Sequence, residues 1–329
     1  SSKNKAARVK FMVTVGEVTS PYFASFSAFQ VGRQANKSIN ATLRDSSYYV
    51  GEAEFAGKRL HVALLDLNSN GMFNDPEPKL FKGDRIGIDL DGNGHFSTFD
   101  DPLKTETFAL SRYIQVAGIW YTFLPSADGL SLKISEADPP LGKIEAHPHI
   151  QSILIRSSTQ TQNVLFTDGK SEAIVGAYEI EKIVMASPKS KKLDWMLEAH
   201  FQKERPKIVV TKDQTLKLKR GEPFEVKLEF TPEQRGRSLD VTVQVLGQGG
   251  ELYRSYEYGE RVAQPGFIIT DSQNRPVAFG PASKGGRWTI PKSLNGRYQI
   301  WPVVDLPGME FDTVAQEVEF RDGKLLEPE

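Results

Sequence analysis

The chain has 329 residues, of which 39% are hydrophobic, 10% aromatic and 25% charged, a globular composition that excludes a disordered polymer or a collagen. The 41 Lys and Arg nearly balance the 42 Asp and Glu, which leaves no basic field to bind a nucleic-acid backbone. Cysteine is absent, so disulfide scaffolds, thiol nucleophiles and Cys-ligated metal sites are excluded, and no apolar run approaches the ~18 residues of a membrane-spanning helix.

Short segments of alternating apolar and polar residues predict β-strands along most of the chain. The alternation is clearest at 60–64, 86–88, 153–155, 216–218, 224–230 and 239–245. The segment 193–204 fits both the helical and the strand period, and we favour a strand because the rest of the chain reads as strands. Frequent short strands separated by turn residues predict an all-β chain of tandem β-sandwich or barrel-like domains.

Proline-rich segments mark two expected domain boundaries. The stretch 136–149 contains three prolines, and KERPK at 203–207 is the next candidate. We therefore expect a β domain at 1–141, a middle β domain or extension at 142–206, and a third domain at 207–329. The dense strands of the third domain resemble an immunoglobulin-like or fibronectin-like sandwich in their general pattern. Because the sequence starts at Ser1 without a Met or an apolar leader, we expect a processed or trimmed chain.

Two acidic segments of the first domain share the pattern D-L-[ND]-x-N-G-x-F at a spacing of 23 residues. Both resemble the EF-hand calcium loop, which dockerin modules also use. The resemblance assigns ligand positions 1, 3, 5, 7, 9 and 12 in each segment. These positions are Asp66, Asn68, Asn70, Met72, Asn74 and Glu77 in the first loop, and Asp89, Asp91, Asn93, His95, Ser97 and Asp100 in the second.

The spacing suits Ca²⁺, which takes 6–8 hard oxygen ligands. Side chains 1, 3 and 5 of a tight loop can aim at one point, and position 7 contributes only its backbone carbonyl. Gly71 and Gly94 stand at position 6, where the sharp turn favours a residue without a Cβ. The second loop has three carboxylates at ligand positions against two in the first, so we expect it to bind more tightly.

Both segments depart from the EF-hand in being entered from predicted strands rather than helices. Glu77 lies between two prolines, and a residue before proline avoids the α region. The last ligand is therefore open between Glu77 and Asp75 in the first loop, and between Asp100 and Asp101 in the second. The alternative to calcium loops is a pair of ordinary Asx-rich hairpin turns.

Other candidate sites carry weaker patterns. Glu145, His147 and His149 would share one face of a strand and could hold a transition metal, but Pro148 interrupts them, no fourth ligand is near in sequence, and a surface linker is favoured. No nucleophile elbow or P-loop pattern occurs, so we expect no enzyme. Aromatic residues near the C-terminus could form either a sugar-stacking platform or a sandwich core. They are Tyr253, Tyr256, Tyr258, Trp288, Tyr298 and Trp301.

Together these patterns predict a secreted, periplasmic or cell-surface protein that binds Ca²⁺ and has a structural or adhesive role. Its expected partners are another surface protein or a polysaccharide; nucleic acid binding and a membrane-spanning segment are not expected. A carbohydrate-binding or accessory module of a polysaccharide-processing system is the first alternative. A calcium-dependent extracellular hydrolase is the second.

Overall fold

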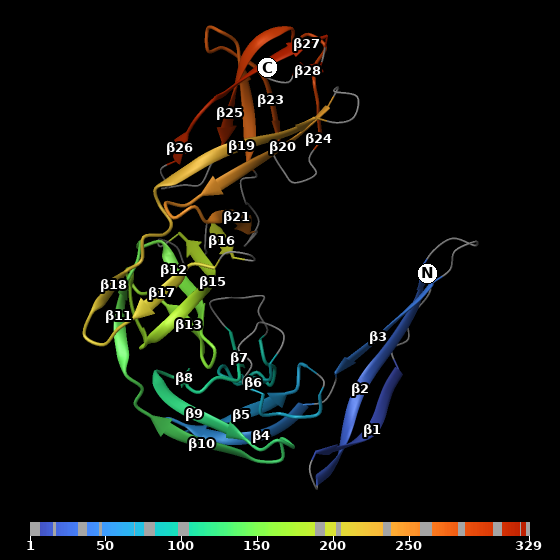
Figure 1. Cartoon of the computed structure of the whole chain (residues 1–329), viewed down its shortest axis with the longest axis vertical. Coiled ribbons are helices and arrows are strands. Elements are labelled where there is room, and N and C mark those ends of the chain that lie inside the picture. Colours follow the sequence, from blue (N-terminus) through green and yellow to red (C-terminus); the bar gives the residue numbers. More distant parts are fainter. Residues whose placement is uncertain are drawn as a thin grey trace. The chain divides into compact units, whose positions relative to one another are not determined.

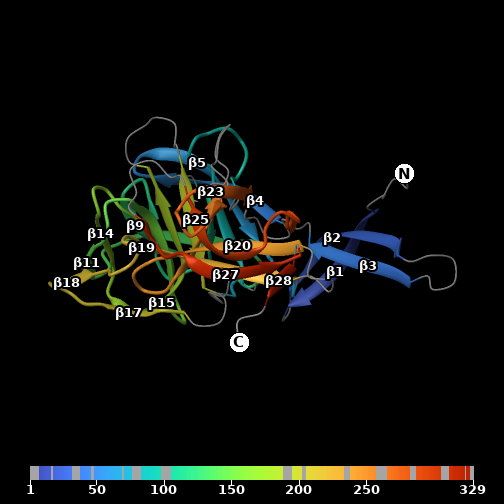
Figure 2. The same ribbon diagram turned by 90° about the horizontal axis from the view of Figure 1, so that it is seen from above.

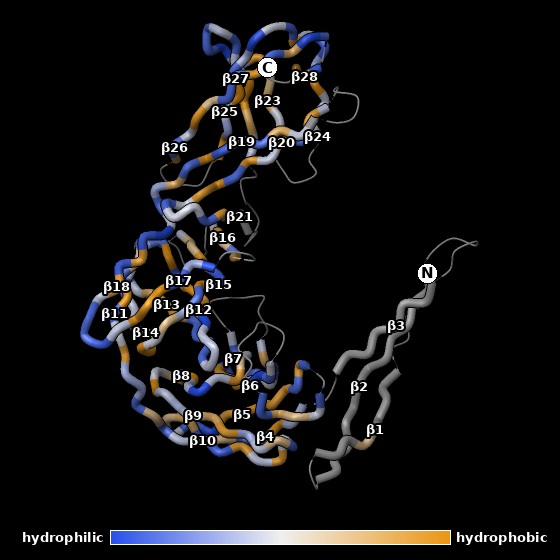
Figure 3. Tube along the Cα trace, in the orientation of Figure 1, coloured by the Kyte–Doolittle hydropathy of each residue, from blue (hydrophilic) through white to orange (hydrophobic). Residues whose placement is uncertain are grey.

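The computed structural model describes residues 7–15, 18–31, 38–45, 48–68, 70–75, 83–97, 105–187, 195–201, 205–232, 238–256, 265–281, 287–304, 311–322 and 324–326. Every regular element in these residues is a β-strand, so the predicted all-β class is confirmed. No helix in this part of the chain has the length and hydropathy to cross a membrane. Apolar and polar residues alternate along many strands, as the predicted period of two requires (Figure 3).

The described residues group into two compact units. The first comprises 1–141, 155–163 and 174–178, and the second comprises 142–154, 164–173 and 179–329. The chain thus passes between the units several times in 142–178. The division into three domains at 142 and 207 remains a prediction.

In the first unit, the described strands β1 to β10 form three antiparallel sheets. The strands β1, β2 and β3 lie side by side (Figure 1 and Figure 2). The second sheet has the order β4-β5-β6-β7 and the third has the order β10-β9-β8. The bounds are β1 Ala7–Val15, β2 Val18–Val31, β3 Ser38–Asp45, β4 Tyr48–Phe55, β5 Lys58–Leu65, β6 Arg85–Ile88, β7 Thr107–Ala109, β8 Ile114–Val116, β9 Ile119–Pro125 and β10 Leu132–Ala137.

The core of the first unit lies between the last two of these sheets. Buried side chains of β4–β6 pack with those of β8 and β9, which makes this part a β-sandwich. The core residues are Phe55, Val62, Leu64, Phe73, Ile86, Ile88, Leu110, Ile114, Val116, Tyr121 and Phe123. Phe73 belongs to the first acidic loop, so that loop is itself part of the core.

The remaining strands form three further sheets. One has the order β14-β11-β18, and another the order β23-β22-β25-β27-β28. The largest has the order β13-β12-β15-β16-β21-β20-β19-β26, with β17 paired to β15 and β24 paired to β20. The bounds are β11 Leu141–Glu145, β12 Ile150–Arg156, β13 Thr161–Leu165, β14 Lys170–Ile174, β15 Gly176–Ala186, β16 Met196–His200, β17 Lys207–Val210, β18 Thr215–Lys217, β19 Phe224–Pro232, β20 Ser238–Leu246, β21 Leu252–Tyr256, β22 Gly266–Thr270, β23 Pro276–Pro281, β24 Arg287–Thr289, β25 Gly296–Val303, β26 Phe311–Thr313, β27 Gln316–Arg321 and β28 Lys324–Leu326.

The second unit contains a sandwich between β19, β20 and the sheet around β22 and β25. Leu228, Leu239 and Val241 meet Phe267, Ile300 and other buried residues in one core. Trp288 and Tyr298 pack against this core, and Tyr253 is buried against Phe224. Three of the aromatic residues that could have formed a sugar-stacking platform therefore contribute to packing instead. Tyr258 lies outside the described residues.

Candidate calcium-binding loops

The two acidic loops leave opposite ends of one antiparallel strand pair. β5 leads into the first loop at Asp66, and β6 leads into the second at Asp89. Leu65 pairs with Arg85 at one end, and the Asp89 N–H donates to the His61 carbonyl at the other. Asp66 follows His61 by five positions along β5, about 17 Å of extended chain. The loops are therefore two separate sites rather than one shared site.

In the first loop, Asp66 fixes the turn from a buried position. Its side chain is fully buried, and its two carboxylate oxygens accept the N–H groups of Asn70 and Gly71 at 3.4 and 2.7 Å. Asn68 Oδ1 accepts the Asn70 N–H, and Asn70 Oδ1 accepts the Met72 N–H. Gly71 has a φ of +81°, which explains why the turn needs glycine there.

Asp75 closes the first loop. Its Oδ2 accepts hydrogen bonds from the side-chain nitrogens of Asn68 at 2.9 Å and Asn70 at 2.6 Å, so the side chains at positions 3 and 5 both reach Asp75. The Asp75 N–H donates to Asp84 Oδ2 at 2.7 Å, and the Asp84 N–H donates back to the Asp75 carbonyl. Of the two alternative last ligands, Asp75 therefore lies beside Asn68 and Asn70. Glu77, the other alternative, lies outside the described residues.

The second loop repeats this hydrogen-bond pattern. Asp89 is 1% exposed, and its carboxylate accepts the N–H groups of Asn93 and Gly94, both at 3.0 Å. Asp91 Oδ1 accepts the Asn93 N–H, and Asn93 Oδ1 accepts the His95 N–H. Gly94 has a φ of +78°. Equivalent positions thus make equivalent contacts in both loops, as the shared motif predicts.

Glu106 is a site residue that the sequence pattern missed. It immediately precedes β7, and pairing of β6 with β7 carries it beside the start of the second loop. Although only 4% exposed, its carboxylate accepts the N–H groups of Leu90, Asp91 and Ser97 at 2.8, 3.2 and 2.9 Å. Carboxylate oxygens of Asp89, Asp91 and Glu106 lie within 4.8 Å of one another.

This donor set suits a hard cation. Three carboxylates in one small volume repel one another, and a divalent cation removes that repulsion. Two of the three, Asp89 and Glu106, are buried, where solvent screens the repulsion between carboxylates least. Asp100 and Asp101, the predicted alternatives for the last ligand, lie outside the described residues. Among the other predicted ligands, Asn74 and His95 are exposed, and Ser97 is half-buried and contacts Glu106.

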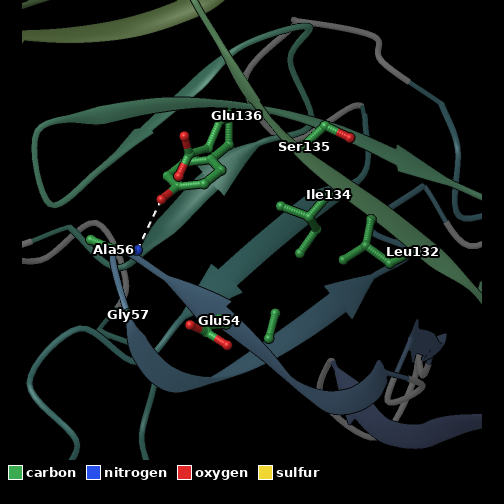
Figure 4. A pocket seen from close by; sticks show the side chains of 9 residues that line it. Glu54, Ala56, Gly57, Leu132, Ile134, Ser135 and Glu136 are labelled. Atoms are coloured by element: carbon green, nitrogen blue, oxygen red, sulfur yellow. Dashed lines mark hydrogen bonds between the residues drawn. The ribbon is translucent and has the colours of Figure 1, made fainter.

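A pocket of about 460 Å³ lies in the first unit between the β4–β5 turn and β10 (Figure 4). Its walls include Glu54 from β4, Glu136 from β10 and Tyr121, whose hydroxyl accepts the Ala56 N–H at 3.0 Å. Both glutamates are exposed to solvent. Among the described residues that line it, the pocket therefore presents no desolvated acid of the kind that general acid catalysis uses.

No protein-family model matches this chain, and comparison with curated protein sequences found no match. Among solved structures, the Bacillus anthracis TIE protein aligns with 98% of this chain and 74% of its own chain. The sequence identity is 11% and the TM-score is 0.17, too low to argue about fold or function.

Proposed function

We propose that this chain is a calcium-binding protein of the cell exterior, secreted, periplasmic or at the cell surface, with a structural or adhesive role. In this proposal, Ca²⁺ orders the connections β5–β6 and β6–β7 of the first unit. The observation that carries the proposal is the cluster of Asp89, Asp91 and Glu106 carboxylates within 4.8 Å of one another. The same turn geometry recurs in the first loop around Asp66.

An ordinary Asx-rich turn explains the position 1 and position 5 contacts, and the three N–H groups that Glu106 accepts would stabilise such a turn as well. Those N–H groups do not remove the mutual repulsion of three carboxylates whose oxygens lie within 4.8 Å of one another, two of the three being buried. A cation removes it, because Ca²⁺ binds several anionic oxygens around one point. Imidazole and thiolate ligands, which softer metals prefer, are not part of this cluster.

The proposed location follows from the expected affinity. Calcium sites of extracellular modules bind at ~10⁻⁴–10⁻³ M, where the ion is abundant. With a dissociation constant near ~10⁻⁴ M and millimolar Ca²⁺, each site adds roughly 1.4 kcal/mol to the free energy of unfolding by mass action. At that concentration of Ca²⁺ the site is occupied most of the time, so the ion stabilises the loop permanently, as a structural role requires.

Calorimetric unfolding in EDTA, in millimolar Ca²⁺ and in millimolar Mg²⁺ tests the proposal. We expect Ca²⁺ to raise the unfolding temperature by several degrees and Mg²⁺ to do so poorly, because Mg²⁺ demands tighter octahedral geometry. The variant Asp91→Ala should lose the contribution of the second loop. Asp91 is exposed, so this variant is expected to fold.

The matched control is Asp138→Ala, which removes an exposed aspartate of the same unit and changes the net charge by the same amount. It should retain the full calcium response. The proposal would be contradicted if the unfolding temperature did not depend on Ca²⁺, or if Ca²⁺ raised it equally in Asp91→Ala and Asp138→Ala. The loops would then be ordinary turns. The extracellular assignment would then lose its support.

A further inference from the structure

A second cluster of metal-binding residue types lies in the second unit, remote in sequence from the calcium loops. His147 and His149 occupy the turn between β11 and β12, and Glu222 occupies the turn before β19. Each offers one ligand atom, and these three atoms lie within 4.8 Å of one another. His149 Nδ1 is 2.5 Å from Glu222 Oε1, and His147 Nε2 is 3.8 Å from Glu222 Oε2.

The three side chains are partly withdrawn from solvent, with exposed fractions of 29% for His147, 17% for His149 and 13% for Glu222. Their environment holds them in place. The ring of Trp195 packs edge-on against His149, with 5.4 Å between ring centroids. Burial lowers the pKa of His147, the charge of Glu222 raises it and His149 lowers it, and the net effect leaves it below its ordinary value.

Backbone hydrogen bonds fix both turns. The Ala186 N–H donates to the His149 carbonyl at 2.9 Å, which joins the histidine turn to the end of β15. On the other side, the Gln248 side-chain amide donates to the Glu222 carbonyl at 2.7 Å. The Gly221 N–H donates to the buried Glu251 at 2.7 Å. The ligand atoms are thus presented by two anchored turns rather than by free surface side chains.

We propose that His147, His149 and Glu222 form a binding site for a divalent transition metal of the zinc class. Two imidazoles and one carboxylate are a ligand set that Zn²⁺ accepts, with a fourth position left for water or an external ligand. Calcium prefers oxygen ligands, so the two kinds of site select different ions. Such a site would join two turns that lie 73 residues apart in sequence.

The geometry is close to what the metal requires. A tetrahedral Zn²⁺ about 2.1 Å from each ligand keeps two ligand atoms about 3.4 Å apart. The distances of 2.5 and 3.8 Å run to different oxygens of the Glu222 carboxylate, and one ligand atom from each residue lies within 4.8 Å of the other two. Side-chain movements of about 1 Å therefore bring the three ligand atoms to the spacing of a tetrahedral ion. Coordination through His147 Nε2 places the imidazole proton on Nδ1. The interaction lost is the 3.3 Å contact from the His149 N–H to that nitrogen, which is long for a hydrogen bond.

Titration of the full chain with Zn²⁺ in saturating Ca²⁺, with the heat of binding measured by calorimetry, tests the proposal. The Ca²⁺ keeps Zn²⁺ from binding at the oxygen-lined loops. Co²⁺ as a second probe reports geometry, because a tetrahedral nitrogen and oxygen site absorbs visible light much more strongly than hydrated Co²⁺. We expect one Zn²⁺ per chain with micromolar affinity. The double variant His147→Ala with His149→Ala should weaken binding at least 100-fold.

The chain provides a matched control. His61→Ala with His200→Ala also removes two of the five histidines, and both side chains are half exposed. This control should bind Zn²⁺ like the wild type. Glu222→Gln keeps the side-chain shape, should fold, and should weaken binding about 10-fold or more. Equal Zn²⁺ affinity in the wild type, the His147/His149 variant and Glu222→Gln, or a Co²⁺ spectrum of the hydrated ion only, would overturn the proposal. Because Ca²⁺ is saturating throughout, neither result depends on the calcium loops.

Discussion

Replacing Glu106 with Ala is expected to lower the free energy of unfolding by about 3 kcal/mol and to abolish the calcium response of the second loop. The 4% exposed carboxylate accepts N–H groups from Leu90, Asp91 and Ser97. Removing an acceptor leaves a buried donor unsatisfied at about 1–3 kcal/mol, and part-buried donors recover some of this from water. The calcium response is lost because Glu106 is one of the three converging carboxylates.

Denaturant unfolding in EDTA and in millimolar Ca²⁺ separates these two effects. The structural loss appears in EDTA, and the lost calcium contribution appears as the difference between the two conditions. Glu136→Ala is the control, because Glu136 is an exposed glutamate of the same unit, and it should change stability by less than about 0.5 kcal/mol. A Glu106→Ala protein with wild-type stability and an intact calcium response would show that Glu106 has neither role.

The strands could be predicted because the alternation of apolar and polar residues follows directly from a sheet with one buried face. This holds for 224–230 and 239–245, which form β19 and β20. The pattern failed to decide between helix and strand at 193–204, and the structure shows why. Met196, Leu197, Glu198 and Ala199 of β16 are all buried, so both faces of this central strand are covered and no alternation is required.

The candidate sites could be predicted only as far as they are local in sequence. The turn residues Asp89, Asp91 and Gly94 belong to one contiguous motif, so their spacing revealed the second loop. Glu106 reaches the site through pairing of β6 with β7, and no spacing rule connects it to Asp89. Glu222 likewise contacts His149 across a sequence separation of 73 residues. Because no fourth metal ligand is visible near them in the sequence, the pattern around His147 and His149 favours a surface linker.

The shared phenylalanine at position 8 of the two loops provides a matched pair with different expected effects. Phe73 is 2% exposed, lies in the core of the first unit and contacts Tyr49 with 4.9 Å between ring centroids. Its N–H also donates to the Ala127 carbonyl at 2.9 Å. Phe96 is only half-buried, and its ring lies against Gly87, where an added Cβ would come within 2.8 Å of it.

We therefore expect Phe73→Ala to lower the free energy of unfolding by about 4 kcal/mol, as for a buried phenylalanine that leaves a cavity. Phe96→Ala should lower it by about 1–2 kcal/mol, in proportion to its smaller buried area. Denaturant unfolding of both variants in EDTA measures the difference without any contribution from Ca²⁺. Equal losses would mean that the two loops are attached to the sandwich equally firmly, contrary to their burial.

The same variants also test whether the loops act independently. Asp66 and Asp89 lie at opposite ends of the β5–β6 pair, and substitutions more than about 7–10 Å apart without shared partners usually add. Phe73→Ala combined with Asp91→Ala should therefore lose the sum of the two single effects within about 0.5 kcal/mol. A larger departure would show that the strand pair transmits strain from one loop to the other. The β5–β6 pair would then have to be treated as one calcium-responsive element rather than as a rigid support for two sites.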